Sequence, residues 1–179
     1  MDEDHDQTGD NPLGEALDEL TPEQRDLALQ RLRSDQDFTS GALLGLVASV
    51  VGAAVWAVVT IATEYQIGFM AVGVGYLVGI AVRTGGKGID SAFSYLGAGL
   101  ALFGCLLGNL FTICGVIASN EGVSFFAVLS LLLLDFQFVQ ELMIETFNPL
   151  DLLYYGIAIY EGYKLSIRQL SVEDVTGAL

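Results

Sequence analysis

Histidine and cysteine are nearly missing from the sequence, and their scarcity narrows the chemistry open to it. The one histidine is His5, and the two cysteines are Cys105 and Cys114. Zinc sites of the His/Cys type, Ser-His-Asp triads and Cys-His pairs all require histidine or clustered cysteine beside other reactive groups. The sequence therefore predicts no catalytic residues, no metal site and no cofactor. An enzyme relying on Asp, Glu and Tyr alone is the least favoured function.

The two cysteines cannot pair with each other. They lie nine residues apart in one apolar segment. At about 3.6 residues per turn, that spacing places them on opposite faces of a helix. Both are interpreted as small buried hydrophobic residues.

Basic residues are scarce as well. Seven Lys and Arg face 22 Asp and Glu, which gives a formal net charge of −15. Nucleic-acid phosphates require Lys and Arg, so nucleic acid is excluded as a partner. Residues 1–40 hold twelve acids against three bases, which predicts an acidic cytoplasmic N-terminal arm. The arm is interpreted as solvated and partly disordered, with contact to a basic partner as the alternative.

The arm contains one helix-start pattern. Thr21 offers an N-cap hydroxyl, Pro22 occupies the first helical position, and Gln24 stands three residues after the cap. Several leucines follow. These residues predict a short helix over about 22–34, which needs a partner surface to bury its leucines.

Long stretches after residue 40 carry no charge at all. Residues 41–63, 66–83, 91–119 and 149–166 are predicted to cross the roughly 30 Å of hydrocarbon in a bilayer. The last of these spans is the least apolar, because it contains Asp151 and Glu161. The predicted fold class is an all-α membrane protein with four transmembrane helices. Residues 41–168 form its membrane domain, and residues 169–179 form a cytoplasmic C-terminal tail.

The basic residues predict the orientation of these four spans. With four spans, every Lys and Arg falls on one side, which the positive-inside rule makes cytoplasmic. Both termini are then cytoplasmic. A fifth span over 122–147 would place Lys164 and Arg168 outside. The seven bases are Arg25, Arg31, Arg33, Arg83, Lys87, Lys164 and Arg168.

Residues 123–147 are predicted to form an external interfacial amphipathic helix. The apolar run over 122–134 is too short to span a bilayer. From Asp135 onward, acidic and apolar residues alternate at helical spacing, and Asn148-Pro149 ends the pattern. A re-entrant helix starting from Ser124 is the alternative.

Glycine pairs at four-residue spacing predict close packing between helices. Lipid tails are as apolar as leucine, so helices in a bilayer associate where small residues let their backbones approach. The pattern fits contacts within one bundle and also fits a homo-oligomer interface. The paired glycines are Gly41 and Gly45, Gly75 and Gly79, and Gly104 and Gly108.

Two segments resemble a group of known sequences. The run Gly-Tyr-Leu-Val-Gly-Ile-Ala-Val-Arg-Thr-Gly-Gly-Lys-Gly at 75–88 and Leu-Phe-Gly-Cys-Leu-Leu-Gly-Asn at 102–109 are similar to small multi-pass bacterial inner-membrane proteins without an assigned activity. The resemblance implies a location in the bacterial inner membrane. It implies no chemistry.

Acidic residues near or within the membrane are the candidate ion or proton site, because an unpaired carboxylate is costly to bury there. The i,i+3 spacing of Glu161 and Lys164 also fits an ion pair. Arg83 and Lys87 beside the glycine-rich turn are candidates for contact with a lipid phosphate. The side chain of Asn109 is predicted to form a hydrogen bond to another helix. The candidate acids are Asp135, Glu141, Glu145, Asp151 and Glu161.

The sequence favours a non-enzymatic accessory or scaffold protein of the membrane. The absence of a catalytic constellation, the glycine-rich bundle and the acidic arm with its one helix motivate this hypothesis. The bilayer and a membrane-complex partner or second copy are the expected contacts. The alternative is a small oligomeric channel or transporter that uses the membrane-proximal acids.

Overall fold

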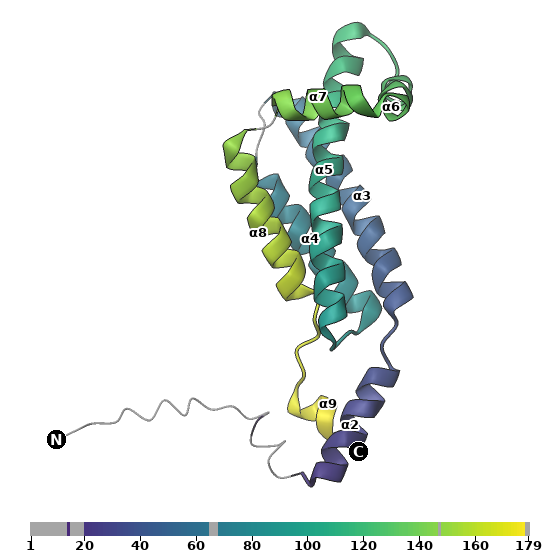
Figure 1. The fold of residues 1–179 in the computed structure, drawn as a ribbon, viewed down its shortest axis with the longest axis vertical. Helices are drawn as coiled ribbons and strands as arrows, with labels where there is room; N and C mark the ends of the chain where they lie inside the picture. Colours follow the sequence, from purple (N-terminus) through teal and green to yellow (C-terminus); the bar gives the residue numbers. More distant parts are fainter. Residues whose placement is uncertain (1–13, 15–19, 65–67, 147, 178–179) are drawn as a thin grey trace, which may run out of the picture.

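The computed structural model describes Gly14 and residues 20–64, 68–146 and 148–177. Helix is the regular structure of this described part, so the predicted all-α class is confirmed (Figure 1). The helices are α2 (Pro22–Ser34), α3 (Phe38–Thr63), α4 (Met70–Gly86), α5 (Ser91–Glu121), α6 (Phe125–Leu134), α7 (Phe136–Thr146), α8 (Pro149–Leu165) and α9 (Val172–Thr176).

Four of these helices form an elongated bundle. α3 packs along α4 and α5, α8 packs along the same two helices, and α4 also touches α5. Thus α4 and α5 lie between α3 and α8. Figure 1 shows α2 and α9 together at one end of the bundle, and α6 and α7 crossing the other end. We call these the α2/α9 end and the α6/α7 end.

Local capping determines where several helices begin. The predicted capping box of α2 is present, because Gln24 N donates to Thr21 Oγ1 at 3.3 Å and Thr21 N donates to Gln24 Oε1 at 3.0 Å. α3 begins earlier than the predicted residue 41, because Asp37 Oδ1 accepts from Ser40 N at 3.0 Å and caps it. α4 starts at Met70 rather than 66, and residues 65–67 lie outside the described part of the chain.

Small residues bring the bundle helices into backbone contact. A Cβ added at Gly75 of α4 would lie 2.7 Å from Cα of Ala158 in α8, which is closer than real atoms approach. A Cβ at Gly162 of α8 would lie 2.6 Å from the carbonyl oxygen of Gly97 in α5. α8 therefore sits against α4 and α5 at distances that larger residues would prevent.

The six glycines predicted from the four-residue spacing all lie where another helix of the same chain comes close. These contacts are intramolecular, so the spacing has a role without a second copy. The nearest neighbours of an added Cβ include Gly86 at Gly41, Val82 at Gly45, Ala158 at Gly75, Leu165 at Gly79, Val74 at Gly104 and Trp56 at Gly108.

Buried side chains complete the core of the bundle. Trp56 of α3 and Tyr155 of α8 meet across its centre, with ring centroids 6.5 Å apart in an edge-to-face arrangement. Ser49 Oγ of α3 donates at 2.9 Å to the carbonyl oxygen of Leu100 in α5. Hydroxyl bonds of this kind add to packing where hydrophobic attraction between helices is weak. Cys105 and Cys114 are both free and buried.

The segment predicted as one interfacial helix over 123–147 is instead two helices. Phe125–Leu134 and Gln137–Ile144 are bent by 109° relative to each other. The break falls at Asp135, whose Oδ1 accepts from Phe138 N at 3.0 Å and starts a new helix. An acidic residue that fits a solvent-facing helical pattern thus serves here as a cap.

Two described helices are long and apolar enough to cross a membrane. They are α3, with 26 residues and a mean hydropathy of 2.4, and α5, with 31 residues and a mean hydropathy of 2.2. The described residues contain a third candidate if the bent pair of α6 and α7 counts as one span. α4 is apolar but shorter, at 17 residues.

The packing predicts that substitution of one glycine of α4 destabilises the bundle and that substitution of another changes its stability little. Gly75→Leu should lower the free energy of unfolding by about 1–3 kcal/mol, because the new side chain would overlap the backbone at Ala158. Gly73 has no atom within 4 Å of an added Cβ, so Gly73→Leu is the matched control. Unfolding in detergent, followed by helical circular dichroism, measures both. Equal stability of the two variants would contradict this α4–α8 contact.

Candidate functional site

The candidate acids do not converge in the structure. Asp151 is buried at 4% exposure, but its Oδ2 accepts from Asn148 N at 2.9 Å and completes the capping box of α8. Asp135 precedes α7, and its Oδ1 accepts from Phe138 N at 3.0 Å. Both carboxylates therefore satisfy backbone N–H groups at helix starts, which is a structural use of an acid.

The other candidate acids are spread along the chain. Glu141 is exposed on α7, and the side chain of Glu145 lies outside the described part of the structure. Glu161 is half-buried near the C-terminal end of α8. The described ion pairs do not join Glu161 to Lys164, whose Nζ lies 5.7 Å from the ring centroid of Tyr160. Among the described residues, no group of three or more His, Cys, Asp or Glu is placed to hold a metal ion.

Arg83 and Lys87 lie together at the α2/α9 end. Lys87 N donates to Arg83 O at 3.0 Å, and Lys87 adopts a left-handed backbone with φ of 48° as it ends α4. Both side chains are exposed. They are accessible at this end, where a lipid phosphate could reach them.

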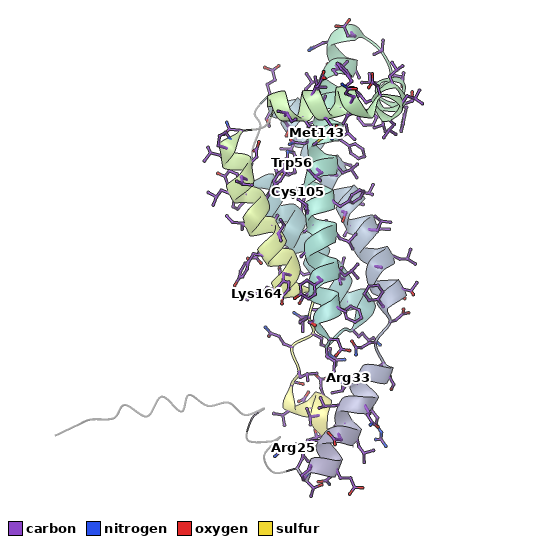
Figure 2. The ribbon with its side chains drawn as sticks, viewed as in Figure 1. Arg25, Arg33, Trp56, Cys105, Met143 and Lys164 are labelled. Carbon is purple, nitrogen blue, oxygen red and sulfur yellow. The ribbon has the colours of Figure 1, made fainter. Side chains whose placement is uncertain are left out.

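A buried polar cluster lies between α3, α5 and α8. Asn109 Nδ2 donates to Tyr155 OH at 2.7 Å, and both residues are buried. Tyr155 OH in turn lies 3.5 Å from the carbonyl oxygen of Cys105. The predicted interhelical bond of Asn109 therefore joins α5 to α8. Figure 2 shows Trp56 and Cys105 beneath Met143 of α7, far from Arg25 and Arg33.

Within the part of the chain that the structure describes, two donors beside this cluster have no hydrogen-bond partner. Trp56 Nε1 is fully buried, and Thr60 Oγ1 belongs to a residue only 6% exposed. Ser94 Oγ is also without a partner, but it lies near the opposite end of α5. A buried polar group without a hydrogen bond is disfavoured by roughly 1–3 kcal/mol. The Trp56 and Thr60 donors therefore show that hydrogen bonding is incomplete in this part of the bundle.

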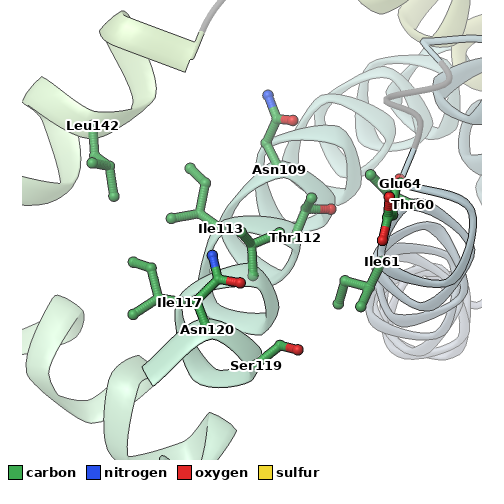
Figure 3. A pocket seen from close by; sticks show the side chains of 11 residues that line it. Thr60, Ile61, Glu64, Asn109, Thr112, Ile113, Ile117, Ser119, Asn120 and Leu142 are labelled. Atoms are coloured by element: carbon green, nitrogen blue, oxygen red, sulfur yellow. The ribbon is translucent and has the colours of Figure 1, made fainter. Parts of the chain in front are cut away.

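A cavity of about 570 Å³ opens beside Thr60. Figure 3 shows Thr60, Ile61 and Glu64 of α3 facing a longer wall from α5. Its buried floor includes Thr60 and Asn109, while Glu64 and Asn120 are exposed near the helix ends. The α5 and α7 lining residues are Asn109, Thr112, Ile113, Val116, Ile117, Ser119, Asn120 and Leu142.

A second cavity of about 310 Å³ lies on the other side of Asn109. It is bounded by Leu106 of α5, by Tyr155 of α8 and by Gln140, Met143 and Ile144 of α7. α7 thus contributes to the walls of both cavities, and Asn109 lines both. The arrangement is suited to non-covalent binding at an amide and a hydroxyl.

Sequence reasoning singled out Asn109 but missed Thr60 and both cavities. Thr60 lies in an uncharged span where threonine is usual, so its type gives no signal. The cavity walls are mostly Ile, Val and Leu, which also fill tight cores. A packing gap depends on how helices diverge in space, and one sequence does not contain that information.

The α2/α9 end is a second organised region. Gln36 Nε2 donates to Asp90 Oδ2 at 2.9 Å, and Asp37 N donates to Gly86 O at 3.0 Å. These bonds join the segment between α2 and α3 to the end of α4 and to the loop after it. α2 also contacts α9, and Ala28, Leu32 and Val175 are buried there.

The C-terminal segment is joined to the same region. Arg168 N donates to Gly88 O at 2.8 Å, and the Arg168 guanidinium pairs with Asp174. The Ser171 backbone N–H, together with its hydroxyl and the nearby Arg168 charge, lowers the pKa of Asp174 below its ordinary value. Asp174 is therefore ionised at neutral pH and holds α9 in its capped form.

Comparison with known proteins adds no relative to this picture. No protein-family model matches the chain, and neither a curated protein nor a solved structure matches it. The resemblance to small bacterial inner-membrane proteins therefore stays a prediction.

The Asn109–Tyr155 bond makes a testable prediction. Tyr155→Phe removes the hydroxyl that accepts from Asn109 Nδ2, and should lower the free energy of unfolding by about 1–3 kcal/mol. Tyr95 is 68% exposed, so Tyr95→Phe is the control and should change it little. Unfolding in detergent measures both. An unchanged Tyr155→Phe variant would show that the bond contributes nothing to holding α8 on α5.

Proposed function

We propose that this chain is a multi-pass protein of the bacterial inner membrane, with α3, α4, α5 and α8 as four spans and both termini cytoplasmic. α3 and α5 support this by length and hydropathy. α4 and α8 have 17 residues each, at the lower limit of the roughly 17–25 that span a bilayer. α4 packs along both long helices, and α8 packs along α4 and α5, which supports the same placement.

The charges of the folded chain support this orientation. All the Lys and Arg residues belong to the α2/α9 end. They lie in α2, in the last turns of α4 and α8, and in the segments that follow α4 and α8. Figure 2 shows Arg25, Arg33 and Lys164 toward that end. Under the positive-inside rule, the α2/α9 end is the cytoplasmic end.

Within this placement we propose a non-enzymatic accessory or scaffold role. The observation that carries it is the α2/α9 end, where the segments just before α3 and just after α8 are joined to the bundle by hydrogen bonds from Gln36, Asp37 and Arg168. This folded unit supports docking of another protein. The dispersed acids Asp135, Asp151 and Glu161 give less support to the channel or transporter alternative, which stays a hypothesis.

The docked partner is proposed to carry a basic surface. α2 exposes Glu23 and Asp26 together with Arg31 and Arg33, and α9 exposes Glu173. The excess of acids comes from the sequence before α2, since residues 1–40 together hold twelve acids against three bases. Complementary charge speeds association and disfavours acidic competitors. Leu27 of α2 is 48% exposed and adds apolar area beside these acids.

Cross-linking in cells followed by purification in detergent tests this role. The wild type should recover a basic protein, and a variant with every acid of residues 1–35 changed to its amide should lose most of it. The matched control changes Glu64, Glu121 and Glu141 to Gln at the opposite end and should retain it. Recovery of no partner by the wild type, or equal recovery by the amide variant, would count against the proposal.

Cysteine labelling tests the orientation separately. In a background with Cys105→Ala and Cys114→Ala, a membrane-impermeant maleimide should label Asn120→Cys in intact spheroplasts. Thr84→Cys and Ser171→Cys should label only after permeabilisation, since all three residues are exposed in the structure. Labelling of Ser171→Cys from outside would show that α8 does not span as proposed.

A further inference from the structure

The larger cavity has the properties of a ligand site that the accessory role does not use. Small-molecule sites typically enclose about 300–1,000 Å³, with mostly apolar walls and a few polar groups. The cavity between α3 and α5, of about 570 Å³, fits this description. We propose that it binds a neutral amphiphile, with an uncharged oxygen-bearing head at Thr60 and an apolar tail along α5. The inference shares the membrane placement of the proposed function but not the accessory role.

The hydroxyl of Thr60 is the polar group of the cavity that is available to hydrogen-bond a ligand. Other threonine hydroxyls nearby are already bonded: Thr112 Oγ1 donates to Gly108 O at 2.9 Å, and Thr63 Oγ1 donates to Val59 O at 2.7 Å. Thr60 Oγ1 is buried, lines the cavity and has no partner. A carbonyl, ether or hydroxyl oxygen on a ligand would complete its hydrogen bonding.

The charges around the cavity favour an uncharged head. Glu64 is the one ionisable residue among the described lining residues, and the seven bases of the sequence lie on or beyond the other ends of the helices. An anionic head would meet Glu64 without a counter-charge. A cationic head would pair with Glu64 at the exposed helix end, where ion pairs contribute little, and would leave Thr60 unbonded.

The apolar lining favours a tail. Ile61, Ile113 and Ile117 form the wall beyond Thr60, and Leu142 of α7 adds to it. Val116 also lines the cavity and is 43% exposed, so the wall reaches the outer surface of the bundle. In the proposed placement that surface faces lipid, so an amphiphile can enter from the bilayer.

Photolabelling of the full-length protein in phosphatidylcholine nanodiscs tests the proposal. The probe is a monoacylglycerol with a diazirine in its chain, and the comparison probes are the alkyl sulfate and the alkyltrimethylammonium of equal chain length. The monoacylglycerol should label α3 and α5 saturably and more tightly than either charged probe. Thr60→Val should weaken saturation about fivefold to tenfold, whereas Thr60→Ser, which keeps the hydroxyl, should not.

Matched variants separate a specific site from general contact with lipid. Val116→Trp should abolish saturable labelling by filling the cavity, while Val58→Trp, at a residue 66% exposed and outside the lining, should not. Thr63→Val should also leave labelling unchanged. Labelling that survives both Thr60→Val and Val116→Trp would show only bulk acyl chains in the cavity and overturn the proposal. Tighter labelling by either charged probe would overturn it too.

The photolabelling result tests the ligand site separately from the proposed accessory role. Loss of saturable labelling with normal cysteine accessibility of Asn120→Cys would refute the ligand site and leave the membrane placement standing. Saturable labelling with an unrecovered protein partner would refute the accessory role and leave the ligand site standing.

Discussion

The structure depends on the close approach of α8 to its two neighbours. A Cβ at Gly97 would overlap Ser166 and the Gly162 carbonyl oxygen, and one at Gly75 would overlap the backbone of Ala158. In a bilayer, where hydrophobic attraction between helices largely vanishes, contact of this quality holds a helix in a bundle. α8 carries Asp151, Glu161 and Lys164 within 17 residues, so in the proposed placement it depends most on this contact.

The contacts between helices differ along the bundle. Toward the α2/α9 end, small residues such as Gly41 and Gly86 meet, and the helices approach closely. Toward the α6/α7 end, the rings of Trp56 and Tyr155 meet edge to face, and both cavities with Asn109 in their lining occur there. The candidate site thus lies beside these ring contacts.

Much of the bundle could be predicted from the sequence, because uncharged runs and caps are local signals. The range 22–34 for α2 and the fourth helix near 149 follow from the Thr21 and Asn148 caps with their prolines. The amphipathic pattern that begins at Asp135 indicated a change there, but the sharp bend between α6 and α7 could not be predicted, since an acid at helical spacing fits a solvent-facing residue equally well. The use of Asp151 as a cap was available in the pattern Asn-Pro-x-Asp but was interpreted as a candidate ion site. Thr60 could not be singled out from the sequence, because only the folded structure shows that its hydroxyl has no hydrogen-bond partner among the described residues.

Other hydroxyl groups of α3 form hydrogen bonds that the Thr60 hydroxyl lacks. Ser49 donates to carbonyl oxygens of Gly45 and Leu100, so it is satisfied both within α3 and across to α5. Thr63 donates back to Val59 within the helix. Thr60 lies between them on the same helix and is buried without such a bond. Because a helix offers carbonyl oxygens to every Ser and Thr along it, the helix alone does not account for this exception. What distinguishes Thr60 is the cavity in front of it, so the free donor and the free space are best explained together by a ligand oxygen.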